Sequence, residues 1–362
     1  MTYLIAIKTA VILFPILALL FTGPYILYQY HRFASINPIK TIVIYSFIFY
    51  LLCAYFLVIL PLPTLDSVKN NPPWMIQTIP FHFIIDFIKE TPLIIHDPST
   101  YLKTIFHPSF YVVAFNILLF IPLGAFLRYI KGYSLKKIIK VSFLVSLFFE
   151  FTQVSRLYGI YPRPYRLCDI DDLILNTIGG GIGYLIMLDL EQKIPSKKEL
   201  EEISLKKGEQ VSPLRRITLF HLDLILYLIA ITFLNKIHLI LVFILYFTII
   251  PIVYHQKTLG SSFLNIRFKK TTSSILYYIR PYAIYSYYLL FPYFIFTIIN
   301  AINYYFPSSN IKIPIALLGI ITIFLFYIIN LLILCIKKSH YYDCFFKTQL
   351  ESTIKDKNRK SN

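Results

Sequence analysis

The sequence predicts an all-α fold, a polytopic bundle of about nine transmembrane helices. Of its 362 residues, 57% are hydrophobic and only 15% are charged, and the mean hydropathy is +0.65. Soluble domains carry about a quarter charged residues, so a composition this apolar indicates a membrane protein. The apolar residues also gather in long runs, and a helix needs about 20 of them to cross the hydrocarbon core.

Nine windows along the chain have this length and composition. They lie near 9–30, 41–61, 109–130, 138–158, 172–190, 217–235, 237–255, 281–303 and 312–336. Between the second and third windows, residues 62–108 form a long loop rich in proline and aromatic residues. Its segment PWMIQTIPFHFIIDFIKE is compatible with a short helix in the membrane interface or with an ordered loop, because it contains both apolar residues and helix breakers.

The charges of the loops predict the orientation of the spans. Alternate loops on one side hold 26 of the 35 Lys and Arg residues, and those on the other side hold 9. Cytoplasmic loops carry the excess of positive charge. We therefore expect the N-terminus outside and the C-terminus in the cytoplasm, which an odd number of spans also requires.

One charged stretch divides the spans into five plus four. The segment EQKIPSKKELEEISLKKGEQVSPLRR is mixed in sign and poor in apolar residues, which is typical of a linker. We therefore expect a transmembrane module over 1–192, a cytoplasmic linker over 193–212 and a second transmembrane module over 213–350. A basic cytoplasmic tail over 351–362 completes the chain.

Several functional classes are disfavoured. The formal net charge of +17 is spread over the loops and offers no continuous phosphate-binding face, so we expect no nucleic-acid partner. The four cysteines lack C-x-x-C or zinc-ligand spacing, so neither a disulfide framework, a metal nor a cofactor is expected. No Ser-His or Cys-His pairing indicates a nucleophile, and this favours a protein that is not an enzyme.

Polar residues of the fourth and fifth windows are expected to line an external cleft. Glu150 and Gln153 share one face near the outer end of the fourth. The fifth begins with RLCDIDDLILNTIGGGIGY, in which Asp169, Asp172 and Asn176 share a face. Ionisable residues at membrane depth are costly unless they are paired or face water, so they mark a functional site. The predicted binding residues are Glu150, Gln153, Arg166, Asp169, Asp171, Asp172, Asn176 and, from the third window, Asn116.

The role of these residues has several interpretations. Glu150 is expected to pair with Arg156, Arg163 or Arg166, either in a binding site or only to fix helix packing. Asp169 or Asp172 could instead cap the fifth helix. The carboxylates could act as an acid and base pair, or could bind a hard cation through oxygen ligands.

Small residues of the same windows are assigned to helix packing. Gly179, Gly180 and Gly183 form a surface that lets another helix approach closely. Pro122 and Gly124 of the third window are assigned to packing with them.

These motifs together resemble the VanZ-like family of bacterial membrane proteins, over roughly residues 40–190. The resemblance rests on FNILLFIPLG, EFTQ and RLCDIDDLILNTIGGGIGY, in that order. The family is named for a protein linked to resistance against the glycopeptide teicoplanin. The resemblance implies a cell-envelope role in the bacterial plasma membrane, with a cell-wall precursor, a lipid headgroup or a glycopeptide as partner beside the bilayer. The oligomeric state stays open.

The second module contains a further polar set. Arg216 and Asp223 lie on one helical face, with Asp223 about two turns into the sixth window, where it should pair with Arg216 or another cation. With the segments KTLGSSFLNIRF and HYYDCFFKT they resemble the RDD family over about 213–350, with Asp343 as the second aspartate. Asn265 and Tyr342 depart from that family's usual Gly and His. The resemblance implies transport or ion exchange.

Three functions therefore remain open at this point. They are an envelope protein that confers tolerance to glycopeptides through the external cleft, a transporter or ion exchanger that uses Asp223, and a structural membrane scaffold.

Overall fold

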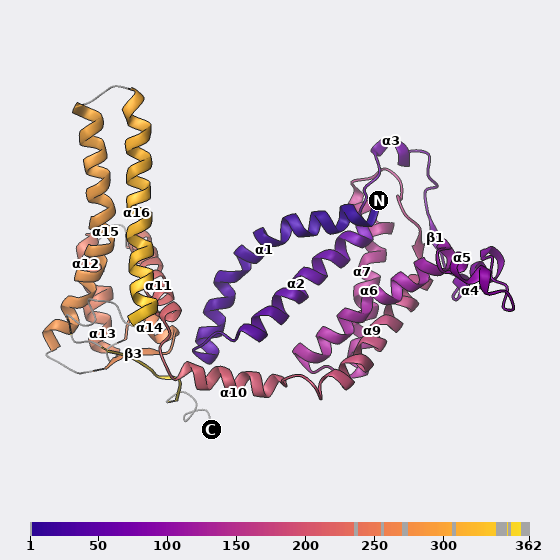
Figure 1. Cartoon of the computed structure of the whole chain (residues 1–362), viewed down its shortest axis with the longest axis horizontal. Coiled ribbons are helices and arrows are strands. Elements are labelled where there is room, and N and C mark those ends of the chain that lie inside the picture. Colours follow the sequence, from indigo (N-terminus) through magenta and orange to yellow (C-terminus); the bar gives the residue numbers. More distant parts are fainter. Residues whose placement is uncertain are drawn as a thin grey trace. The chain divides into compact units, whose positions relative to one another are not determined.

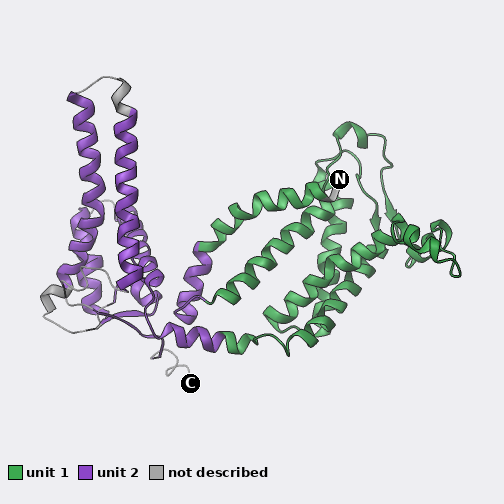
Figure 2. Ribbon diagram, viewed as in Figure 1, with its two compact units in different colours: residues 1–22, 37–200 green, residues 23–36, 201–362 purple. Residues whose placement is uncertain are grey.

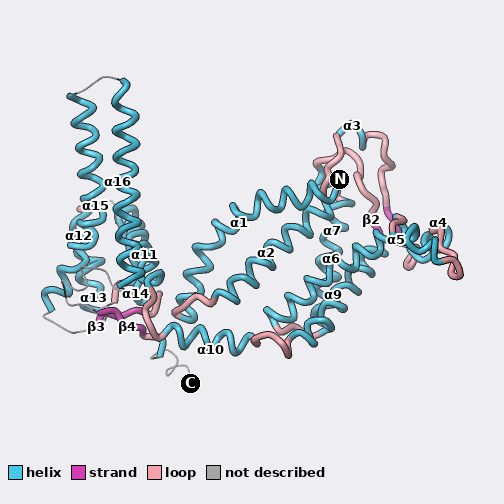
Figure 3. The backbone as a smooth tube through the Cα atoms, viewed as in Figure 1, coloured by secondary structure: helices cyan, strands magenta, loops and turns pink. Residues whose placement is uncertain are grey.

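Helices dominate the structure, a computed structural model that describes residues 2–234, 238–254, 257–269, 274–305, 309–337, 346 and 349–355 (Figure 3). The chain forms two compact units (Figure 2). Unit 1 contains residues 1–22 and 37–200, and unit 2 contains residues 23–36 and 201–362. The expected all-α class holds for the described residues. Besides the helices they form only two small sheets, of two strands each.

Figure 1 labels most of the elements along the chain. Two helices contribute residues to both units, α1 (Thr2–Phe33) and α10 (Lys197–Gly208). Unit 1 also contains α2 (Pro38–Ile59), α3 (Leu65–Val68), β1 (Ile76–Gln77), α4 (His82–Glu90), η1 (Pro98–Thr100), α5 (Tyr101–Ile105), α6 (Pro108–Lys131), α7 (Leu135–Val154), α8 (Arg156–Gly159), β2 (Cys168–Asp169) and α9 (Ile170–Leu190). Unit 2 also contains α11 (Pro213–Phe233), α12 (Leu239–Ile244), the π-helical turn η2 (Leu245–Ile249), α13 (Ile250–Val253), α14 (Leu259–Phe263), β3 (Ile266–Lys269), α15 (Ser274–Tyr305), α16 (Ser309–Lys337) and β4 (Gln349–Ser352).

Seven helices of the described residues are long and apolar enough to cross a membrane: α1, α2, α6, α9, α11, α15 and α16. The chain is therefore a multi-pass membrane protein. The predicted fourth window is α7, a helix of 20 residues that begins with a cluster of lysines and carries Glu150. The predicted seventh window is the shorter run Leu239–Val253, which η2 interrupts. The count of nine spans and the orientation stay predictions.

Local signals explain the boundaries of the helices around the site. Asn37 caps α2 by accepting hydrogen bonds from the amides of Ile39 and Lys40 at 3.0 and 3.3 Å. Pro108 stands in the first turn of α6, where its missing N–H has no cost, and Gly132 ends that helix with a φ of 65°. The turn between α6 and α7 is so short that the two helices are antiparallel neighbours. The rings of Phe120 and Phe149 pack between them with centroids 6.0 Å apart.

The glycines of α9 bring this helix into close contact with α6. A Cβ added at Gly179 would overlap the carbonyl oxygen of Ile117, and one at Gly183 would overlap that of Ile121. A step of four residues along α9 thus matches a step of four along α6, so the two helices run parallel. Gly124 of α6 meets the backbone of Gly180 in the same contact. Pro122 lies within α6 and lines a groove together with Ile39 of α2 and Met187 of α9.

The predicted linker contains helix α10, whose residues are distributed between the two units. Leu200 and Ser204 of this helix are buried. In unit 2 the Ser35 hydroxyl donates to the carbonyl of Ser204 at 2.5 Å, and Gly208 lies against the carbonyl of Phe33. The end of α1 therefore packs with the second unit, whereas the sequence predicted a first module over 1–192.

Arg215, near the start of α11, connects several elements of unit 2 through hydrogen bonds. Its side chain is fully buried. The guanidinium donates to the carbonyls of Gly208 at 3.0 Å and Leu264 at 2.9 Å, and to the hydroxyl of Ser352 in β4. Because α10, α14 and the β3–β4 sheet converge on this one side chain, it fixes their positions around the start of α11.

We expect Gly179→Ala to destabilise the protein by about 1–3 kcal/mol, because the added methyl must displace the backbone of α6. Gly181→Ala is the matched control, since its Cβ would meet only the Leu135 side chain at 4.0 Å. Thermal unfolding of the two purified variants in detergent measures the difference. Equal stability of both variants would contradict this packing.

Candidate functional site

A cavity of about 410 Å³ lies in unit 1 among the ends of α2 and α7 and the beginnings of α6 and α9. Six of the eight predicted binding residues line it: Asn116, Glu150, Gln153, Arg166, Asp172 and Asn176. The other walls are apolar and consist of Ile7, Leu57, Val58, Val112, Phe115, Leu119 and Phe149. A cavity with apolar walls and a group of convergent polar side chains fits an amphipathic ligand.

Asp172 lies in a network that links three helices. The side-chain amide of Asn116 in α6 donates to its carboxylate. In α7 the Ser146 hydroxyl donates to the main-chain carbonyl of Asp172 at 3.4 Å and accepts from the Asn176 amide at 2.8 Å. Ser146 was not predicted, although it lies one turn before Glu150 on the same helix and this spacing was a usable signal.

Asn176 offers an unused acceptor beside this network. The residue is only 4% exposed, and its Oδ1 has no hydrogen-bond partner among the described residues. A buried polar atom without a partner is costly. A ligand in the cavity that donates a hydrogen bond to Oδ1 would remove this cost.

Glu150 is buried, and its partner is a backbone amide. Its Oε2 accepts a hydrogen bond from the amide of Asp169 at 2.9 Å. The prediction that Glu150 pairs with an arginine is wrong, since no such ion pair occurs among the described residues. Arg166 donates instead to the carbonyls of Val58 and Leu60, at 2.5 and 3.0 Å. These carbonyls stand at the C-terminal end of α2, where they lack intrahelical partners and attract a cation.

Arg156, the second predicted partner of Glu150, is also engaged elsewhere. It donates to the carbonyls of Pro162 at 3.2 Å and Pro73 at 3.4 Å. Its guanidinium also lies over the ring of Trp74, 5.7 Å from the centroid. It therefore holds the loop between α7 and α9 in place and does not neutralise the carboxylates of the cavity.

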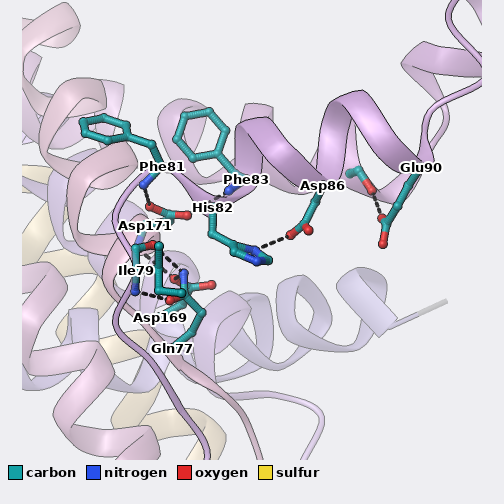
Figure 4. Close-up of polar contacts among 10 residues, drawn as sticks. Gln77, Ile79, Phe81, His82, Phe83, Asp86, Glu90, Asp169 and Asp171 are labelled. Atoms are coloured by element: carbon teal, nitrogen blue, oxygen red, sulfur yellow. Dashed lines mark hydrogen bonds and ion pairs between the residues drawn. The ribbon is translucent and has the colours of Figure 1, made fainter.

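The two other predicted aspartates lie outside the lining of the cavity and hold the backbone. Asp169 caps α9 by accepting the amide of Asp171 at 2.8 Å, and it accepts the Gln77 side chain at 3.3 Å. Asp171 is buried and accepts the amides of Phe81 and Phe83 at 2.6 and 2.9 Å (Figure 4). Of the alternatives for Asp169, the structure thus shows the capping role, and it adds a second cap, by Asp171 on α4.

The segment before α9 is joined to the loop before α4. β1 and β2 pair in parallel, and the Cys168 amide donates to the carbonyl of Met75 at 2.9 Å. The pKa of the Cys168 thiol is raised to about 12, first by burial and then by the nearby carboxylate of Glu150. Burial is also the main cause that raises the pKa of Asp169.

The polar residues of unit 2 form a separate arrangement. Asp223 is 4% exposed and accepts hydrogen bonds from the Tyr246 hydroxyl at 2.8 Å, the Thr258 hydroxyl at 2.9 Å and the Gly260 amide at 3.1 Å. Within the described residues its partners are thus neutral donors, and the predicted pairing with an arginine is wrong. The reason is that the turn into α14 points its hydroxyl and amide at the carboxylate.

The arginines near Asp223 have different positions. Arg216 lines a small cavity of about 60 Å³ together with Asp223 and Arg280. The fully buried arginine is its neighbour Arg215, which the sequence reading did not single out. Asp343, predicted as the second aspartate of this set, lies outside the described residues.

Comparison with known proteins identifies one domain. The family model described as VanZ/LLP1 matches residues 47–191. The chain therefore contains a VanZ-like domain there, and this range includes all six predicted polar residues of the cavity. The comparisons with the curated proteins and with the solved structures give no match.

We expect Asp171→Ala to release the start of α4, because the amides of Phe81 and Phe83 lose their acceptor. Loss of a helix-capping carboxylate costs about 0.5–2 kcal/mol locally. Hydrogen exchange of residues 81–84 should be faster in this variant than in Asp66→Ala, which removes a side chain that is 86% exposed. Unchanged protection of these amides would show that the Asp171 cap does not hold α4.

Proposed function

We propose that this protein acts in the envelope of a bacterial cell, as a multi-pass protein of the plasma membrane. In this proposal, the cavity of its VanZ-like domain binds an amphipathic envelope molecule from the extracytoplasmic side. Such binding would lower susceptibility to glycopeptide and lipoglycopeptide antibiotics. The observation that carries the proposal is the pair of carboxylates, Glu150 and Asp172, in a cavity that has a group of polar side chains and otherwise apolar walls.

The polar end of the cavity suits a headgroup with hydrogen-bond donors or a positive charge. Glu150 and Asp172 would accept from it, and the free Oδ1 of Asn176 would orient it. Arg166 also lines the cavity and would face an anionic group of the same ligand, while its bonds to Val58 and Leu60 hold it in place. A zwitterionic or amino-bearing headgroup satisfies both signs of charge.

The apolar walls suit a hydrocarbon chain. Ile7, Leu57 and Phe115 belong to three different helices and line the same cavity. Burial of apolar surface contributes about 25 cal/mol per Å², so a chain that lies against them would add affinity without specificity. A lipid-linked component of the cell wall combines such a chain with a polar headgroup. Each residue has a binding role in this proposal, and no covalent step is required.

A second candidate function rests on Asp223. A carboxylate that is buried in a membrane-crossing helix is costly to ionise, and this one is held by three neutral donors beside a small cavity that Arg216 and Arg280 also line. We propose it as the proton or cation site of an RDD-like unit over about 213–350, which would make this half of the chain a transporter or ion exchanger. The likeness of TLGSSFLNIRF to that family supports the same assignment.

We expect Asp172→Asn to make cells as susceptible to lipoglycopeptides as cells that lack the gene, because the cavity loses a negative acceptor. Asp189→Asn on the same helix is the control, since Asp189 is exposed and pairs only with Lys193. The minimal inhibitory concentration is measured at equal protein abundance. Susceptibility and antibiotic binding that do not change on deletion of the gene would contradict the proposal, and parallel loss of abundance and tolerance in Asp172→Asn would indicate a scaffold.

For the second candidate, we expect proteoliposomes with the whole chain to conduct protons or monovalent cations. Asp223→Asn should abolish this flux because it removes the titratable group. Glu202→Gln, at an exposed position of α10, should leave it unchanged. Absence of flux in the unmodified protein, or equal flux in Asp223→Asn, would exclude Asp223 as a transport site.

A further inference from the structure

Helix α4 presents an apolar face that no other described element covers. Ile84, Ile85 and Ile88 lie on this face and are 45%, 42% and 73% exposed. The other sides of the helix carry one packing contact with α6 and one ion pair within α4. Phe87 packs against Phe110 of α6 with ring centroids 6.3 Å apart, and His82 pairs with Asp86 at 3.0 Å. We call Ile84, Ile85 and Ile88 the α4 face.

Both ends of α4 are tied to the first turn of a membrane-crossing helix. At its beginning, Asp171 in the first turn of α9 accepts the amides of Phe81 and Phe83. At its end, Glu90 accepts a hydrogen bond from the hydroxyl of Ser109 in the first turn of α6 (Figure 4). These hydrogen bonds therefore hold α4 beside the first turns of both membrane-crossing helices.

Because α6 and α9 pack in parallel, these hydrogen bonds also determine how α4 is oriented relative to the membrane. Because the two helices run in the same direction, their first turns lie at the same surface of the membrane. A helix that is fastened to both first turns must lie along that surface, and it cannot project away from it. An amphipathic helix in this place buries its apolar face at the boundary between headgroups and acyl chains.

We propose that α4 is a lipid-binding helix of the membrane interface, with the α4 face buried in the phospholipid leaflet on the side where α6 and α9 begin. The surrounding loop agrees with this placement, since Trp74 and Leu102 are 64% and 66% exposed and tryptophan favours the interface. The loop also reaches the cavity. Gln77 donates to Asp169, and the Asp169 amide donates to Glu150. Lipid bound to α4 would thus hold the cap of α9 and the carboxylate of the cavity in place.

Tryptophan quenching tests this inference in the full chain, because Trp74 is its one tryptophan. In a Trp74→Phe background, Ile88→Trp places the probe on the α4 face, and Lys89→Trp places it at the neighbouring exposed position. Both variants are reconstituted in phosphatidylcholine vesicles. Their emission is then quenched either by phospholipids brominated near the headgroup end of the acyl chains or by acrylamide in the aqueous phase.

The inference requires that brominated lipid quench the Ile88→Trp probe more strongly than the Lys89→Trp probe, with the reverse order for acrylamide. Equal quenching of both probes by acrylamide and none by lipid would place α4 in water and overturn it. Quenching of Ile88→Trp by neither agent would show that another copy of the chain covers the face, and would overturn it as well. In the unmodified protein, brominated lipid should quench the emission of Trp74. If it does not, the result would count against placing the whole loop in the membrane interface.

Discussion

The close approach of α9 to α6 is the contact on which the rest of unit 1 depends. Side chains at Gly179 and Gly183 would overlap the carbonyls of α6, so only glycine permits this distance. Without a hydrophobic drive between helices in lipid, van der Waals packing of small residues is a main source of their association. The same approach brings Asp172 within reach of Asn116 and sets the first turns of both helices side by side.

The polar groups above this contact are connected in one chain of hydrogen bonds. Asp171 holds the start of α4, Asp169 caps α9, and the Asp169 amide binds Glu150. Each bond offsets the cost of burying a polar group at the edge of the membrane. Glu150 and Asp172 line the cavity and keep acceptor capacity beyond these bonds. The proposed binding of a ligand with hydrogen-bond donors rests on this arrangement.

Much of this arrangement follows from sequence periodicity, because residues three or four apart share a helical face. The nine apolar windows all contain helices, and the faces of α7 and α9 bring Glu150, Gln153, Asp172 and Asn176 to one cavity. Long-range partners do not follow from periodicity. The bonds of Arg166 to α2, the contact of Asp171 with α4 and the wall formed by Ile7 join segments far apart in sequence. Arg215 and Arg216 are consecutive and lie on different sides of α11. The sequence pattern did not show that the side with Arg215 is the buried one.

The most direct test of the account is the side of the membrane on which the cavity lies. Cys168 immediately precedes Asp169, whose amide binds Glu150, and can report this side when Cys53, Cys335 and Cys344 are replaced by serine. A membrane-impermeant thiol reagent is applied to intact cells at alkaline pH, because burial raises the pKa of this thiol to about 12; Cys168→Ser is the blank. The account predicts labelling of intact cells. Labelling only after the membrane has been opened would contradict it, because the cavity would then face the cytoplasm.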